Sequence, residues 1–166
     1  MINFSIDTKR ILFLVGLFIL FGCNKNEELV GFYLDRGFEF TLLNNKNEDL
    51  LSSETTGAIN EEDIRLFYSV EGELQPVYNA NFDYPRNFLI YEDGGMNRIR
   101  IFMNSSDTEE KPITIIDWGN NDTDTVAVEF TYTSTMTAKR KVWVNNELIW
   151  DYQDDEFPLI TLHKDY

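Results

Sequence analysis

The sequence predicts an all-β fold, an antiparallel β-sandwich, and three observations support this prediction. Short segments in which apolar and polar residues alternate recur along the chain. The clearest covers residues 126–132, where Val126, Val128 and Phe130 occupy every second position. Turn-forming groups of Gly, Asn, Asp and Pro separate these segments. No segment sustains the period of an amphipathic helix, so we expect strands throughout.

The first half of the predicted domain contains five such segments. Phe38 and Phe40 flank Glu39, which is the spacing of a half-buried strand. Pro76 cannot donate a hydrogen bond to a neighbouring strand, so its segment is predicted to lie at a sheet edge. Asn60 precedes acidic residues and is expected to cap one short helical turn at most. The predicted strands are 38–42, 64–70, 74–78, 88–91 and 99–103, with a polar turn at 44–49, a long surface loop at 52–63 and a loop at 79–87.

The second half of the chain contains a predicted hairpin. Asn145 and Asn146 tolerate positive φ angles and suit the two-residue type I′ turn that joins antiparallel strands. Several short strands separated by regular turns are typical of an immunoglobulin-like sandwich. The predicted strands are 113–118, 126–132, 139–144, 147–152 and 159–163, with an acidic turn at 119–124.

The first residues of the chain have the pattern of a cleaved signal peptide. Lys9 and Arg10 precede an apolar run at 11–21, which matches the roughly 7–15 apolar residues of a secretory signal. A membrane-spanning helix needs about 20 apolar residues, so a plain membrane helix is the weaker alternative. The run ends in Leu20-Phe21-Gly22-Cys23, which resembles the lipobox of a bacterial lipoprotein precursor.

This resemblance implies cleavage before Cys23 and acylation of that cysteine. Each buried CH₂ contributes about 0.8 kcal/mol, so two or three acyl chains would hold the protein stably at the outer membrane. Residues 24–28 loosely resemble a surface-export signal of Bacteroidota-type lipoproteins, and an ordinary polar tether is the alternative. The implied organisation is a signal peptide at 1–22, a tether at 23–30 and one β domain at 31–166.

Charge and cysteine content exclude several function classes. The chain has 29 acidic and 14 basic residues, a net charge of −15. Removal of residues 1–22, which contain one acid and two bases, makes it −16. Such a surface repels phosphate backbones, so we expect no nucleic-acid partner. Cys23 is the only cysteine, so its acylation leaves the domain without disulfides, thiolate metal sites or a cysteine nucleophile.

The predicted hairpin at Asn145-Asn146 supplies the candidate ligand-binding residues. Strict alternation on both strands places two tryptophans, a tyrosine and two lysines on one face, opposite Val142, Val144, Ile149 and an Arg140–Asp151 pair. The aromatic face is either an exposed ligand platform or part of the sandwich core. The candidate binding residues are Trp143, Trp150, Tyr152 and Lys141, with Leu148 and Lys139 beside them.

No pattern in the sequence indicates catalysis or a metal. Asn120, Asp122 and Asp124 have the spacing of a calcium loop, but the sixth and twelfth positions are threonines, so an EF-hand is excluded and only a looser calcium site remains as an alternative. Asp124-Thr125-Val126 resembles an O-glycosylation acceptor of Bacteroidota. His163, the only histidine, is expected to be a structural or exposed strand residue. No serine lies in a nucleophile elbow and no glycine-rich phosphate loop is present.

These observations predict a lipid-anchored envelope protein that binds a partner without catalysis and without a cofactor. Its ligand is expected to be a glycan, a peptide or an envelope protein, bound through strand faces or the long loops. One alternative is a structural accessory subunit that docks on an outer-membrane complex. A glycoside hydrolase that uses two carboxylates is a less favoured one.

Overall fold

The structure is a computed structural model that describes residues 31–153 and 159–165. The chain divides into two units, Met1–Gly31 and Phe32–Tyr166, and all the strands described below lie in the second. The predicted signal peptide at 1–22, the lipidated Cys23 and the tether lie outside the described residues, so the lipid anchor stays a prediction. Within the described part of the chain, no helix is long and apolar enough to cross a membrane.

The described residues are almost entirely strands, as the alternation predicts. Their one 3-10 helix, η2 at Glu61–Asp63, has Asn60 as its N-cap, which confirms the single short helical turn expected there. The strands are β1 Tyr33–Asp35, β2 Gly37–Asn44, β3 Arg65–Val70, β4 Glu73–Pro76, β5 Phe88–Asp93, β6 Met96–Phe102, β7 Ile113–Gly119, β8 Asp122–Tyr132, β9 Met136–Val144, β10 Glu147–Asp151 and β11 Ile160–Lys164.

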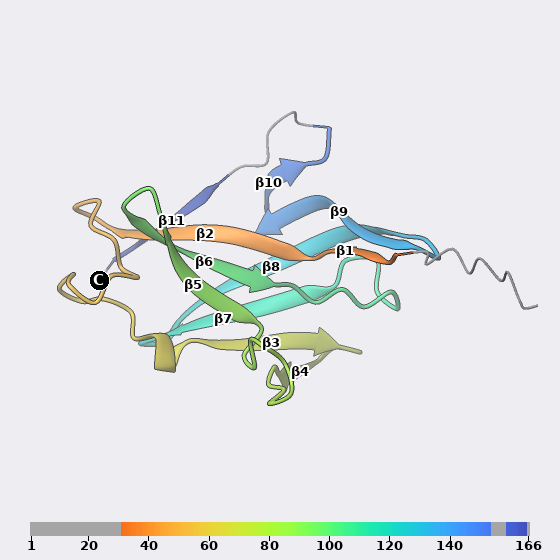
Figure 1. Ribbon diagram of the computed structural model, residues 1–166, viewed down its shortest axis with the longest axis horizontal. Coiled ribbons are helices and arrows are strands. Elements are labelled where there is room, and N and C mark those ends of the chain that lie inside the picture. The colour runs from red at the N-terminus through yellow and green to blue at the C-terminus, as the bar shows by residue number, and fades with distance from the viewer. Residues whose placement is uncertain (1–30, 154–158, 166) are drawn as a thin grey trace, which may run out of the picture. The chain divides into compact units, whose positions relative to one another are not determined.

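Two sheets pack together. The larger has the order β1-β9-β8-β7-β3-β4, with β10 also paired to β9, and the smaller has the order β11-β2-β6-β5. Figure 1 shows β2, β6 and β5 as one layer in front of β7, β8 and β9. The all-β sandwich is therefore confirmed. Two strand pairs, β1 with β9 and β11 with β2, are parallel, so the sheets are mixed rather than wholly antiparallel as predicted.

The core lies between the two sheets and uses the residues that the alternation places on one face. From the smaller sheet, Phe38 and Phe40 are fully buried, and from the larger sheet Val126 and Val128 are. Each such side chain contributes about 1.5–3 kcal/mol when it leaves water. Arg98 and Arg100 point away from this core, as predicted, while Ile99 and Ile101 on the same strand are buried.

The chain changes sheets at Arg36. The three residues of β1 pair with β9 in the larger sheet, and β2 begins one residue after Arg36 in the smaller sheet. Lys139 of β9 holds this crossover, because its Nζ lies 2.6 Å from Asp35 Oδ1 and also donates to the carbonyl of Gly37. Burial lowers the pKa of Lys139, and the neighbouring Asp35 partly offsets that effect.

Two hairpins turn on asparagine pairs with positive φ. Asn145 and Asn146 have φ of 50° and 70°, which confirms the predicted turn. Asn120 and Asn121 have φ of 53° and 63° and form an equally short turn. The predicted acidic turn at 119–124 is therefore too long, because β8 already begins at Asp122.

A bulge in each strand of the C-terminal hairpin overturns the predicted faces. On β10, Leu148 is opposite Trp143, but Trp150 is opposite Val142 rather than Lys141, so Ile149 is an extra residue. On β9, Arg140 is the extra residue opposite the step from Glu129 to Phe130. Each bulge reverses the alternation of side chains beyond it. The prediction that Trp150 and Lys139 share a face with Trp143 is therefore wrong: both side chains are buried.

Candidate functional site

The structure separates the residues of the predicted aromatic face. Trp150 is 8% exposed and lies in the core, beside Val142 and Val144. Both interpretations of the hairpin assumed strict alternation, so neither describes it: one tryptophan is in the core and the other, Trp143, lies half-buried on the outer side of the sheet.

The outward residues of this hairpin are already paired with charged side chains. Lys111 Nζ lies 4.0 Å from the centroid of the Trp143 ring, and the Arg140 guanidinium lies 4.1 Å from the ring of Tyr152. Lys141 Nζ is 3.0 Å from Asp151 Oδ2, in place of the Arg140–Asp151 pair that strict alternation predicts. A binding role for Trp143, Tyr152 and Lys141 stays a prediction.

The ammonium of Lys164 lies between the two acids of the suggested calcium loop. Lys164 Nζ is 2.9 Å from Asp122 Oδ2 and 2.7 Å from Asp124 Oδ2. In the described ranges, no group of three or more His, Cys, Asp or Glu side chains is placed to hold a metal ion. Asp124, the first residue of the Asp-Thr-Val motif, is buried and bonded to Lys164. His163 is an exposed strand residue, as expected.

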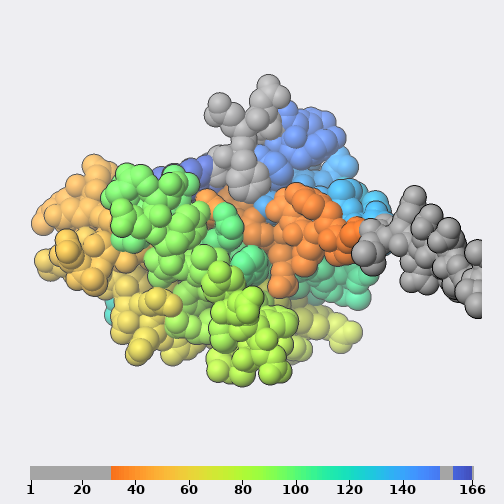
Figure 2. Space-filling view, viewed as in Figure 1, coloured from red at the N-terminus to blue at the C-terminus, as the bar shows by residue number. Residues whose placement is uncertain are grey.

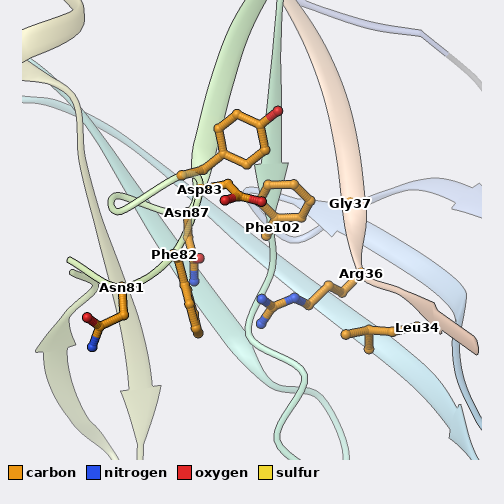
Figure 3. Close-up of a pocket in the computed structure, with 9 residues that line it drawn as sticks. Leu34, Arg36, Gly37, Asn81, Phe82, Asp83, Asn87 and Phe102 are labelled. Atoms are coloured by element: carbon orange, nitrogen blue, oxygen red, sulfur yellow. The ribbon is translucent and has the colours of Figure 1, made fainter. Parts of the chain in front are cut away.

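A pocket lined by aromatic side chains lies elsewhere, where β1, the end of β6 and the loop at 77–87 meet. Its volume is ≈ 390 Å³, within the range of about 300–1,000 Å³ typical of small-ligand sites. Figure 3 shows Arg36 extending from the crossover toward the loop that carries Phe82. We call it the aromatic pocket, and its main lining residues are Leu34, Arg36, Phe82, Asp83, Tyr84 and Phe102.

The loop at 77–87 holds its aromatic side chains in place through its own hydrogen bonds. Its neck is closed by the Asn79 amide, which donates to the Pro85 carbonyl at 2.8 Å, and a turn follows in which Phe82 N donates to Asn79 O at 3.1 Å. Arg86 fixes the outer end through Glu61 Oε1 at 2.8 Å. Figure 2 shows this loop, in yellow-green, as a projecting part of the surface. These bonds hold the loop in one conformation, which reduces the entropy cost of binding.

Two lining residues, Asn87 and Phe102, are joined by a partly buried chain of hydrogen bonds through Tyr68. The Tyr68 hydroxyl donates to the carbonyl of Phe102 at 2.7 Å and accepts from Asn87 Nδ2 at 2.9 Å. Burial raises the pKa of Tyr68, although the charge of Arg36 and the bond from Asn87 act in the opposite direction. Tyr68 therefore stays protonated at neutral pH, and its hydrogen bonds link β3 to the loop at 77–87 and to β6.

The walls of the pocket combine exposed apolar surface with polar groups. Phe82 and Tyr84 are 49% and 43% exposed, and the Tyr84 ring stacks on Phe102 with centroids 5.9 Å apart. The Arg36 guanidinium lies 5.7 Å from the centroid of the same Phe102 ring. Asn81 and Asp83 add an amide and a carboxylate at the rim. Such a combination suits a ligand that is apolar on its faces and polar at its edges.

In two other surface pockets the arginines are engaged already. One of ≈ 490 Å³ contains Arg65 and Arg86, which bond to the Ile64 carbonyl and to Glu61. Another of ≈ 450 Å³ contains Glu39 with Arg100, an ion pair of the smaller sheet. We therefore take the aromatic pocket as the candidate site.

None of the pocket residues was singled out in the sequence, and one signal was available. The loop at 79–87 was predicted correctly, yet it contains Phe82 and Tyr84 beside Asn and Asp residues. Large aromatic side chains in a polar connection have no strand partner to cover them, and such exposure marks interaction sites. The part played by Arg36 had no local signal, because it depends on which strands the crossover joins.

The architecture and the pocket thus define a small all-β domain with a preformed, aromatic-lined cleft. Comparisons of the chain with protein-family models, with curated proteins and with solved structures found no match.

Proposed function

We propose that this protein is a non-catalytic binding module, held at the outer membrane by lipid on Cys23, whose aromatic pocket takes a sugar residue of a glycan. The single observation that supports this most is the grouping of Phe82, Tyr84 and Phe102 around one concave surface. A sugar ring has apolar C–H faces that lie flat on aromatic rings, and hydroxyls at its edge that pair with amides and carboxylates.

The rim of the pocket supplies such polar partners. Asn81 offers an amide that both donates and accepts, and Asp83 offers two accepting oxygens, which suits vicinal hydroxyls. The loop that carries both is fixed at its neck and at Arg86. A preformed site of this kind needs little rearrangement when a ligand enters.

Among the described residues that line the pocket, Asp83 is the one carboxylic acid. Hydrolysis of a glycosidic bond by the usual route needs two carboxyl groups, about 5–10 Å apart across the bond. The lining therefore favours binding over the hydrolase alternative. The accessory-subunit alternative calls for a broad flat apolar patch. The outward rings of Trp143 and Tyr152 instead each have a cation 4.0–4.1 Å from the ring centroid, so this surface is not purely apolar.

A glycan array tests the proposal with the intact protein in detergent. Wild type is expected to bind at least one carbohydrate of a panel of neutral and acidic polysaccharides. Phe82→Ala should weaken that binding about tenfold or more, the loss expected of a truncated aromatic anchor. The melting temperature should change little, because half of the Phe82 side chain is already exposed.

The matched control is Tyr132→Ala, which removes a partly exposed aromatic ring that does not line the pocket. It should bind like wild type. Equal losses in the two variants, or no carbohydrate bound by wild type, would contradict the proposal.

A further inference from the structure

Arg36 differs from the other described arginines because its guanidinium has neither an anionic partner nor a hydrogen-bond acceptor among the described residues. Its guanidinium makes no ion pair and no hydrogen bond with a described residue, and its recorded contact is with the face of the Phe102 ring, 5.7 Å away. The other described arginines, each engaged by an acid or a main-chain carbonyl, are Arg65, Arg86, Arg98, Arg100 and Arg140.

The charge balance of the chain makes this isolation informative. Acids outnumber bases by 29 to 14, so a surface arginine has many potential partners. Arg36 is nevertheless half-buried on the wall of the aromatic pocket. A partly desolvated guanidinium without an anion is unfavourable, and a ligand anion would relieve that cost.

The backbone holds Arg36 in this position from both sides. Its carbonyl accepts a hydrogen bond from the Met103 amide at 2.9 Å, and the residue before it, Asp35, is paired with the buried Lys139. The side chain extends from this fixed point into the pocket (Figure 3). A guanidinium is a planar fork that matches the two oxygens of a carboxylate, so this placement is that of a carboxylate receptor.

The pocket also contains Asp83, which makes no ion pair with Arg36 and leaves space between the two charges. A ligand with a carboxylate at one edge and hydroxyls at another satisfies both groups at once, because Asp83 accepts from hydroxyls. Phe82 and Tyr84 supply the apolar surface for the ring between these edges.

We infer that Arg36 selects an anionic sugar, a uronic acid residue whose carboxylate pairs with the guanidinium. This inference rests on the proposed function and narrows its ligand class. The carboxylate and its methyl ester have nearly the same shape and differ in charge, so a comparison of the two isolates the contribution of Arg36.

The experiment titrates the intact protein in detergent with oligosaccharides of galacturonic acid, of mannuronic acid and of hyaluronan, each as the free acid and as the methyl ester. Wild type is expected to bind one of the acids about tenfold more tightly than its ester. Acid and ester are compared at one salt concentration, because salt screens both the attraction to Arg36 and the repulsion between the acid and the negatively charged domain.

Variants at Arg36 then assign the preference. Arg36→Gln should bind acid and ester equally, at the level of the wild-type ester, and Arg36→Lys should keep part of the preference because it keeps the charge without the fork. The matched control, Arg65→Gln, lies outside the aromatic pocket and should retain the full preference.

Equal binding of acid and ester by wild type, or a preference that survives Arg36→Gln, would overturn the inference. Failure on all three acids while a neutral glycan binds would overturn it and leave the proposed function intact. Failure on every carbohydrate would overturn both. If Arg36→Gln does not fold, Arg36→Lys still tests the assignment: a reduced preference supports it, and an unchanged preference overturns it.

Discussion

Asp124 joins distant parts of the chain through one buried carboxylate. Its oxygens accept hydrogen bonds from Trp118 Nε1, Asn145 Nδ2 and Lys164 Nζ, all at 2.7 Å. Burial alone would raise the pKa of this carboxyl, but the bonds from Lys164, Asn145 and Trp118 outweigh it and hold the pKa below its ordinary value of 3.8. Because Asp124 lies on β8 and Lys164 on β11, the ion pair links the two sheets.

Asp124→Asn should lower the free energy of unfolding at pH 7 by about 1.5–3 kcal/mol, because it removes the charge of this carboxylate while Asp122 remains as a partner of Lys164. A carboxyl with a lowered folded-state pKa stabilises the fold fully above its unfolded value of 3.8, and this stabilisation is lost as pH falls through the folded-state pKa. The difference between wild type and variant should therefore shrink below pH 3.8. Urea unfolding at several pH values measures it, with the exposed Asp83→Asn as control. If the difference in free energy of unfolding between wild type and variant is as large at about pH 2 as at neutral pH, this account is wrong.

At the scale of the elements, turns and alternation predict most strands, while bulges escape prediction. Asn145-Asn146 and the alternation at 126–132 both appear where the sequence places them. A bulge adds one residue to one strand and leaves no mark in the pattern when both faces are apolar, as in the hairpin of β9 and β10. Ile149 and Arg140 are such residues, and they move Trp150 and Lys139 into the interior.

The bulge on β10 makes the two tryptophans of the hairpin unequal, and their truncation should show it. Trp150→Ala should cost about 3–5 kcal/mol of stability, because it opens a cavity in the core. Trp143→Ala should cost about 1 kcal/mol, since the Trp143 ring lies on the outer side of the sheet under Lys111. Chemical denaturation of both variants measures the difference. Similar losses from the two variants would mean that strict alternation, and not the bulge, describes β10.

At the scale of the whole molecule, the sequence predicts the all-β sandwich but not the aromatic pocket, which lies where β1, the end of β6 and the loop at 77–87 meet. The alternation places Phe102 and the loop at 79–87 in separate segments, and nothing local connects them to Arg36. Their meeting depends on the strand order and on the crossover of the chain from β1 to β2. Strand order is set by long-range packing, so a single sequence without relatives cannot specify which loop faces which strand.

The lipid anchor is the whole-molecule property that the sequence alone predicts, through Leu20-Phe21-Gly22-Cys23. Cys23→Ala should abolish incorporation of labelled palmitate in cells and shift the protein from the membrane fraction to a soluble or unprocessed form, because the acyl chains supply the attachment. Mass spectrometry of the wild type should find a chain that begins at an acylated Cys23. Asn24→Ala, which keeps the cysteine, is the control and should label normally. Labelling that persists in Cys23→Ala, or a wild-type N-terminus without fatty acid, would remove the anchor and leave the aromatic pocket to be tested on a protein located elsewhere.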